Sequence, residues 1–228
     1  MLTVEEWQAV ALTLSVAARA VLLGLPLALA TAWVLARSRL PGRAALDVLA
    51  HLPLVLPPVV TGWLLLLLFG VHGPLGAWLM AWFGIRLVFT TAGAALACGV
   101  MVFPLMVRSI RLSLELVDPG LEDAARTLGA GRVDRFLSIT LPLAAPGVLV
   151  GVITAFAASL GEFGAVITFA ANIPGQTQTL PLAIYAALQT VGGESTAARL
   201  SLVSLGLALC GLFAAEFLGR RLRLAIGR

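Results

Sequence analysis

Few residues of this chain could carry out chemistry. Its 228 residues include 15 basic side chains, all of them arginine, 11 acidic side chains and two histidines, His51 and His72. Neither histidine has a second metal ligand at a suitable spacing, and no Ser/His/Asp arrangement predicts nucleophilic catalysis. A phosphate-binding loop of the GxxxxGK[ST] type cannot be built without lysine. We therefore expect no catalytic, cofactor-binding or metal site, and a partner or an ion gradient must supply any energy.

Two charged residues lie well inside long apolar runs, away from the ends of those runs. Arg19 lies within residues 9–36 and Glu162 within residues 144–170. An ionisable group inside a membrane is costly, so such residues are candidates for a functional or structural role. For Glu162 we favour a structural role, hydrogen-bonded or paired, over a gate. Arg19 is a candidate partner for Glu162, although its side chain could instead extend to the outer surface.

Residues 108–143 form a long, arginine-rich connection between two apolar runs. Its Asp-Pro-Gly turn (residues 118–120) predicts the start of a short helix, because proline suits a first helical turn. A second helical piece, residues 132–140, leads into the next apolar run. A short helix with a small-residue face suits docking to another protein better than catalysis. The acids of this short helix are Glu122 and Asp123, and its small residues are Ala124 and Ala125. Gly129 ends it.

The elements that carry these residues are membrane helices by composition. Apolar residues make up 60% of the chain and charged residues 11%, and the mean hydropathy is +1.03. A soluble domain has about 45–50% apolar and about 25% charged residues, so soluble and disordered classes are excluded. Because a lipid-embedded backbone must satisfy its own hydrogen bonds, runs without strand alternation are helices. We predict an all-α integral membrane protein, a single domain over residues 1–228. Its five spans lie at about 9–36, 49–71, 87–107, 144–170 and 200–218.

Three local features refine this plan. Pro53, Pro57 and Pro58 predict a kinked entrance to the second span. Residues 76–84 are too short to cross a membrane, and their tryptophans suit an interfacial helix. Residues 180–189, which precede the last span, predict another short helix.

The arginines predict the orientation. Residues 1–8, 72–86 and 171–199, on one side, hold only Arg86 and Arg199. The positive-inside rule places the richer side in the cytoplasm, so the N-terminus is outside and the C-terminus inside. The richer side holds twelve arginines: Arg37, Arg39, Arg43, Arg108, Arg111, Arg126, Arg132, Arg135, Arg220, Arg221, Arg223 and Arg228.

The 108–143 connection also contains a recognisable motif. Asp123-Ala124-Ala125, three residues, Gly129, nine residues, Ile139, one residue and Leu141-Pro142 resemble the EAA motif of importer-type ABC transporter permeases. The departure is Asp123, which stands where the family has Glu and keeps the charge on a shorter arm. The resemblance implies a type I importer fold with a cytoplasmic coupling helix. It assigns ATPase coupling to Glu122, Asp123, Ala124, Ala125, Gly129, Ile139, Leu141 and Pro142.

Further segments resemble the molybdate permease subunits of bacterial molybdenum uptake systems. They include HLPLVLPPVVTG (residues 51–62), SLGEFGA (159–165) and NIPGQTQTLP (172–181). The resemblance implies a multi-pass inner-membrane homodimer bound to two cytoplasmic ATPase subunits, which carry ATP and Mg²⁺, and a periplasmic molybdate-binding protein that delivers the oxyanion. Nucleic acid is not an expected partner.

Two alternatives stay open. Sulfate, thiosulfate or tungstate permeases share these motifs, and the binding protein, not this chain, largely selects the oxyanion. A stand-alone secondary transporter or a membrane enzyme would usually carry more ionisable residues inside its spans, above all acids and histidines. Here the candidates are Arg19 and Glu162.

A dianion crossing lipid needs a polar path, which we expect at the dimer interface between spans two to four. Arg108 and Arg111, at the inner end of the third span, could attract an anion, although most arginines here only fix topology. The hydroxyl side chains that could line the path are Thr61, Thr90, Thr91, Ser109, Thr154, Ser159 and Thr168.

Overall fold

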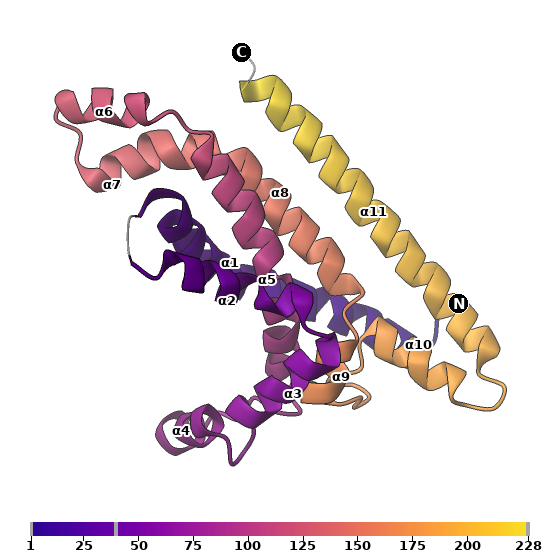
Figure 1. Cartoon of the computed structure of the whole chain (residues 1–228). Coiled ribbons are helices and arrows are strands. Elements are labelled where there is room, and N and C mark those ends of the chain that lie inside the picture. The colour runs from indigo at the N-terminus through magenta and orange to yellow at the C-terminus, as the bar shows by residue number, and fades with distance from the viewer. Residues whose placement is uncertain (1, 39–40, 227–228) are drawn as a thin grey trace.

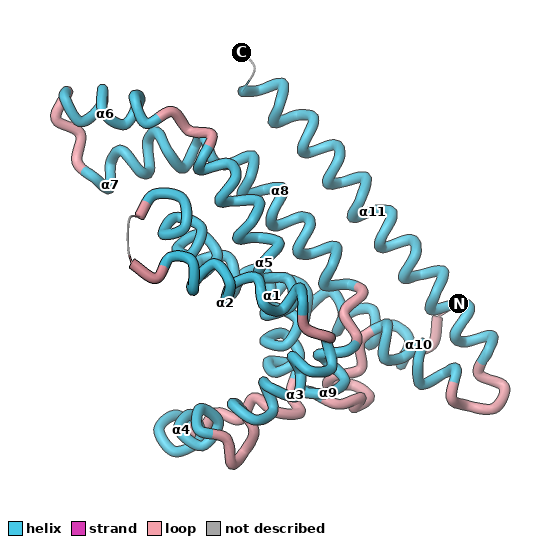
Figure 2. The backbone as a smooth tube through the Cα atoms, viewed as in Figure 1, coloured by secondary structure: helices cyan, strands magenta, loops and turns pink. Residues whose placement is uncertain are grey.

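The computed structural model describes residues 2–38 and 41–226, and this part of the chain consists of helices and connecting loops, with no strand (Figures 1 and 2). This confirms the predicted all-α class. The helices are α1 (Val4–Arg37), α2 (Arg43–Val55), α3 (Pro58–Phe69), α4 (Pro74–Phe83), α5 (Thr91–Glu115), α6 (Pro119–Thr127), α7 (Arg132–Arg135), the π-helical segment η1 (Phe136–Thr140), α8 (Leu141–Leu160), α9 (Gly164–Ala170), α10 (Leu180–Leu188) and α11 (Glu194–Ile226).

Among the described residues, four helical stretches are long and apolar enough to cross a membrane: α1, α5, the continuous stretch Arg132–Leu160, and α11 as far as Ala214. A fifth span exists if α2 and α3 count together, although they are bent by 119°. The bend falls where proline excludes helical backbone from the preceding residue, at Leu56 before Pro57. The prolines therefore break the second span inside its run and do not merely kink its entrance.

The fourth span differs from its predicted limits. The sequence predicts one helix over residues 144–170, whereas the helical stretch begins at Arg132 and ends at Leu160, and α9 is a separate short helix. Figure 2 shows the loop between α8 and α9. α9 packs against α3, where a Cβ on Gly164 would lie 2.7 Å from Pro58 Cβ. The extra apolar residues thus serve packing against α3 and do not extend the span.

Small residues bring the central helices together. α5 lies against both α1 and α8, and its buried residues include Ala94, Ala95 and Cys98. On α8, a Cβ on Gly151 would lie 3.3 Å from Met106 Cα of α5. In lipid the hydrophobic effect does not drive helices together, so close packing of small residues stabilises their association through van der Waals contacts.

The ends of the helices fall into two groups. In Figure 1, α6, α7 and the C-terminal end of α11 lie in the upper part of the view, whereas α4, α9 and α10 lie in the lower part. The arginine count predicts this grouping, and which group faces the cytoplasm stays a prediction. Of the counted arginines, Arg39 and Arg228 lie outside the described residues, and so do the side chains of Arg220, Arg221 and Arg223.

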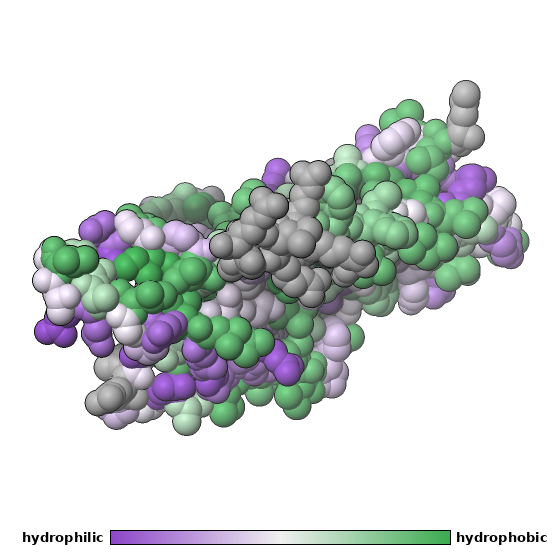
Figure 3. Space-filling model, turned by 90° about the horizontal axis from the view of Figure 1, so that it is seen from above, coloured by the Kyte–Doolittle hydropathy of each residue, from purple (hydrophilic) through white to green (hydrophobic). Residues whose placement is uncertain are grey.

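Apolar side chains cover much of the outer surface. Figure 3 shows them spread widely over the visible face. Leu22, Leu23 and Leu27 on α1 and Leu212 and Phe213 on α11 are all exposed. A soluble protein rarely exposes such continuous apolar surface, whereas lipid or a second copy of the chain would cover it.

Candidate functional site

The predicted docking helix is present and well defined at both ends. α6 begins at Pro119, and the Asp118 side chain accepts a hydrogen bond of 2.8 Å from the Gly120 amide. Past its end, Gly129 has φ +89° and no atom within 4 Å of an added Cβ. Glycine is therefore required there by the left-handed backbone and not by crowding.

The segment 119–131, which we call the hook, projects from the bundle (Figure 1). None of the residues of α6 is buried. Leu128 is 89% exposed and, on α7, Val133 is 71% exposed. Exposed apolar side chains on a projecting helix indicate a surface that a partner covers.

The predicted coupling residues lie partly in the hook and partly beyond its end, in η1 and α8. Asp123, Ala124 and Gly129 are exposed and Ala125 is half-buried. The rest of the motif lies where the chain re-enters the bundle: Ile139 and Leu141 are half-buried, and Pro142 is exposed in the first turn of α8.

Glu122 points back to the protein and not towards a partner. Its Oε1 lies 3.3 Å from Arg37 Nη2 of α1 and accepts a hydrogen bond of 2.8 Å from Thr140 Oγ1. These contacts were not predicted from the sequence, where Arg37 counted only as a topology signal. The position of Arg37 at the end of the first apolar run was the one sign in the sequence that it could contact the connection after the third span.

The two intramembrane charges do not meet. Within the described residues no ion pair joins Arg19 to Glu162, so the structure does not support the predicted pair. Instead, Glu162 Oε1 accepts a hydrogen bond of 3.0 Å from the Ala165 amide in the first turn of α9. This contact supports the structural, hydrogen-bonded interpretation of Glu162, because acids stabilise helix N-termini.

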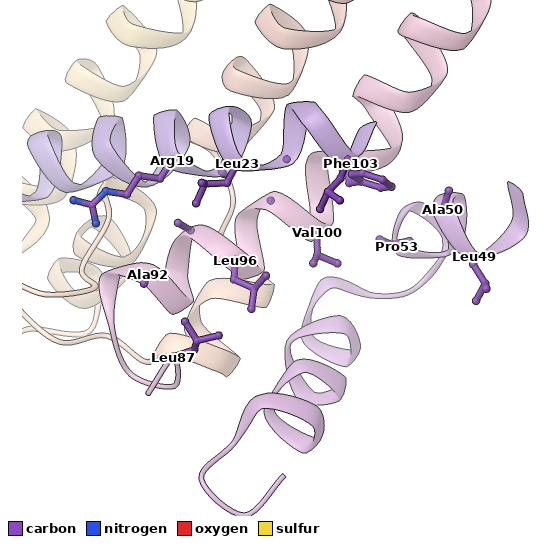
Figure 4. Close-up of a pocket in the computed structure, with 15 residues that line it drawn as sticks. Arg19, Leu23, Leu49, Ala50, Pro53, Leu87, Ala92, Leu96, Val100 and Phe103 are labelled. Atoms are coloured by element: carbon purple, nitrogen blue, oxygen red, sulfur yellow. The ribbon is translucent and has the colours of Figure 1, made fainter. Parts of the chain in front are cut away.

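Arg19 lies at an apolar cavity of about 440 Å³ between α1, α2 and α5 (Figure 4). The other lining residues include Leu23, Leu96, Val100 and Phe103. No hydroxyl side chain predicted for the substrate path lines this cavity.

Several predicted path residues use their hydroxyl groups in hydrogen bonds within the protein. Thr90 Oγ1 accepts a hydrogen bond from the Gly93 amide at the start of α5, and Thr91 Oγ1 donates to the Gln176 carbonyl at 2.7 Å. Ser159 and Thr168 donate to carbonyls one helical turn back, those of Ala155 and Gly164. These four hydroxyls therefore have structural roles in this conformation.

The remaining path candidates lie apart from one another. Thr61 on α3 is buried, and its Oγ1 has no hydrogen-bond partner among the described residues. Ser109 on α5 faces Gly151 of α8, and Thr154 on α8 is exposed. One copy of the chain does not gather these residues into a single lined path.

A polar cleft of about 520 Å³ lies between α2 and α5. Arg111 bridges two carboxylates there, with Nη1 2.9 Å from Asp47 Oδ2 and Nε 2.8 Å from Glu115 Oε1. His51 and Arg108 also line the cleft. Arg111 thus fixes α2 against α5, a role that the sequence analysis did not assign to it.

Residues 20–224 match the family described as binding-protein-dependent transport system inner membrane component. The chain belongs to this family. The match makes it a multi-pass inner-membrane transport subunit and not an enzyme, as the sequence predicts.

Members of the family with high identity are molybdenum permeases. The chain is 57% identical to the molybdenum transport system permease protein ModB of Escherichia coli K12, over the whole of both chains. It is 50% identical to ModB of Haemophilus influenzae over 98% of this chain and 97% of the relative. It is also 42% identical to the sulfate transport system permease protein CysT of Escherichia coli K12, over 75% of this chain and 62% of the relative.

Solved importers share the fold of this family member. A bacterial ABC transporter involved in import of the acidic polysaccharide alginate superposes with a TM-score of 0.77 at 17% identity, over 96% of this chain and 80% of that chain. An amino acid ABC transporter superposes with a TM-score of 0.66 at 20% identity, over 95% and 94%. At these identities the likeness establishes the importer permease fold alone.

Proposed function

We propose that this chain is the transmembrane permease of an ATP-driven importer for molybdate. In the proposed assembly two copies form the translocation unit, and each copy binds one cytoplasmic ATPase subunit through its hook. A periplasmic molybdate-binding protein delivers the oxyanion. Full-length identity of 57% with an Escherichia coli molybdenum permease carries the proposal.

The hook is the proposed contact with the ATPase subunit. Asp123, Ala124 and Leu128 are exposed on α6 or directly after it, and Ala125 is half-buried beside them, so a groove could enclose this surface. ATP-driven closure of the ATPase pair would bring two hooks together and rock the helices from inward-open to outward-open. Such a switch requires a contact whose free energy differs between the two states. A hook that stays bound to the ATPase subunit in both states, with different contacts in each, provides one.

ATP and Mg²⁺ belong on the partner subunit in this proposal. The chain lacks lysine and therefore lacks the phosphate-binding loop, so it provides the path while the ATPase provides the energy. This division predicts that the purified chain alone hydrolyses no ATP.

The oxyanion path would run between the two copies, with α3, α5 and α8 as walls. Thr61, Ser109 and Thr154 remain the candidates whose hydroxyl groups are not committed to the hydrogen bonds described above. A path that a dianion must leave as well as enter needs only a few weak contacts.

Uptake by the reconstituted transporter tests the substrate. Chain, ATPase and binding protein are reconstituted in liposomes, and labelled molybdate uptake is measured with a large excess of unlabelled sulfate, tungstate or molybdate. We expect unlabelled molybdate to abolish uptake and sulfate to leave most of it. Equal competition by sulfate would favour the alternative, a sulfate permease, which the identity to CysT supports.

Co-purification tests the class of transporter. A tagged chain should retain an ATPase subunit through detergent extraction, and ATP should drive uptake without an ion gradient. If uptake instead requires a proton or sodium gradient and no ATPase co-purifies, the chain is a secondary transporter.

A further inference from the structure

One face of α1 meets the base of the hook. Trp33 and Arg37 are one helical turn apart, so their side chains lie on the same face. The Trp33 ring lies edge-on to Phe136 of η1 with the ring centroids 4.9 Å apart, and Arg37 lies 3.3 Å from Glu122 of α6. The end of α1 therefore contacts the connection on both sides of the hook tip.

Arg37 also holds the end of α5. Its Nη2 donates to the carbonyl oxygens of Leu114 and Val117, each at 3.1 Å. Leu114 lies in the last turn of α5 and Val117 just beyond its end, so the guanidinium adds a donor where the helix ends, beside the hydrogen bond that the Val117 amide already makes to the Leu114 carbonyl. Arg37 thus joins three segments through one nitrogen atom, the ends of α1 and α5 and the first turns of α6.

Glu122 extends this junction to α8. The same Oε1 atom that faces Arg37 accepts the hydrogen bond from Thr140, which is 1% exposed and immediately precedes α8. The side chains of Arg37 and Glu122 are only 18% and 21% exposed, so solvent screens their attraction less than it would at an open surface. We call Arg37, Glu122 and Thr140 the inner joint.

Without the inner joint the hook would be loosely attached. α6 packs mainly against α7 and η1, which belong to the same connection. Among the polar contacts of the described residues, the Glu122 carboxylate joins α6 to Arg37 of α1 and to Thr140 before α8. A partner that moved α6 could then rotate it about its flanking loops and leave α1 and α5 in place.

We propose that the inner joint transmits movement of the hook to α1, α5 and α8, with Arg37, Glu122 and Thr140 as positioning residues for ATP-coupled transport. The inference rests on the proposed function, because it needs a partner that moves the hook. It goes beyond that function by naming the residues through which a push on α6 reaches the spanning helices.

Coupling efficiency distinguishes transmission from a merely structural role. The complete transporter, with ATPase and binding protein, is reconstituted in liposomes, and molybdate uptake is measured per ATP hydrolysed. The variants are Arg37→Gln, Glu122→Gln, the double variant and Thr140→Val, which keeps the shape of Thr140 and removes its hydroxyl. Arg43→Gln is the control, since Arg43 is an arginine at the start of α2 outside the joint.

We expect the single variants to retain the ATPase subunit and to hydrolyse ATP, while uptake per ATP falls on the order of 10-fold for Arg37→Gln and Glu122→Gln. The loss of uptake per ATP should be smaller for Thr140→Val. The double variant should be no worse than the more impaired single variant, because residues that act through one contact are not additive. Arg43→Gln should match the parent.

Three outcomes overturn the inner joint: unchanged uptake per ATP in all single variants, multiplicative losses in the double variant, or loss of ATPase assembly in all variants, which indicates a folding role. Absence of ATP-driven oxyanion uptake by the parent transporter would instead remove the proposed function. The parent measurement therefore separates the two failures.

Discussion

Arg199 of α11 forms an ion pair with Glu6 in the first turn of α1. Its Nη2 and Nε lie 2.8 and 3.3 Å from Glu6 Oε1. The other oxygen of Glu6 accepts a hydrogen bond of 2.7 Å from the Thr3 amide, which completes a capping box. One carboxylate therefore caps the start of the first helix and ties it to α11, at the end of the bundle away from the hook.

Removing Arg199 should destabilise the protein without affecting the hook. Glu6 is 5% exposed, so Arg199→Met leaves a buried carboxylate without its charged partner. We expect a loss of about 1–3 kcal/mol in the free energy of unfolding. Thermal unfolding in detergent measures the loss, with Arg86→Met, an exposed arginine predicted on the same side, as the control. Equal melting temperatures for both variants would show that the pair adds nothing.

Gly129 should tolerate asparagine better than valine. Its φ of +89° lies in the left-handed region, where a residue with a Cβ costs roughly 1–2 kcal/mol and asparagine is the better tolerated of the two. We expect Gly129→Val to weaken co-purification of the ATPase subunit and Gly129→Asn to weaken it less. Retention of the ATPase by both variants, or by Gly129→Asp, would contradict a docking role for this end of the hook.

The sequence predicted the helices better than it predicted their breaks. Apolar runs set the approximate places of the spans, because only a helix can carry such a run through lipid. The break at Leu56 has a local cause in the following proline, which the sequence displays. The break after Leu160 depends on the packing of α9 against α3, which a single apolar run does not reveal.

The candidate site was predicted in outline and not in its contacts. The spacing from Asp118 to Gly129 predicted the hook, because caps and turns are local. The pairing of Glu122 with Arg37 joins residues far apart in the sequence, so no local pattern points to it. For the same reason the sequence proposed Arg19 as a partner for Glu162, whereas the Ala165 amide fills that place.

Leu128 should contribute to ATPase binding and not to folding. It is 89% exposed near the tip of the hook, so Leu128→Glu removes no internal packing. We expect Leu128→Glu to release the ATPase subunit during co-purification while the melting temperature of the permease alone stays within a degree or so of the parent value. Val191→Glu provides the matched control, because Val191 is fully exposed in the loop between α10 and α11. Loss of ATPase in both variants would point to a general effect of added charge.

The contact between α5 and α8 should reject even one added methyl group. A Cβ on Gly147 would overlap the Ser113 side chain and lie 2.7 Å from the Ser109 carbonyl oxygen, which belongs to helix backbone and cannot easily move. Overpacking of this kind typically costs about 1–3 kcal/mol, so Gly147→Ala should lower the melting temperature in detergent. Gly206→Ala on α11 adds the same group where no atom lies within 4 Å, and it should be neutral or slightly stabilising. If Gly147→Ala and Gly206→Ala have the same melting temperature, α5 and α8 are not packed as closely as in the structure.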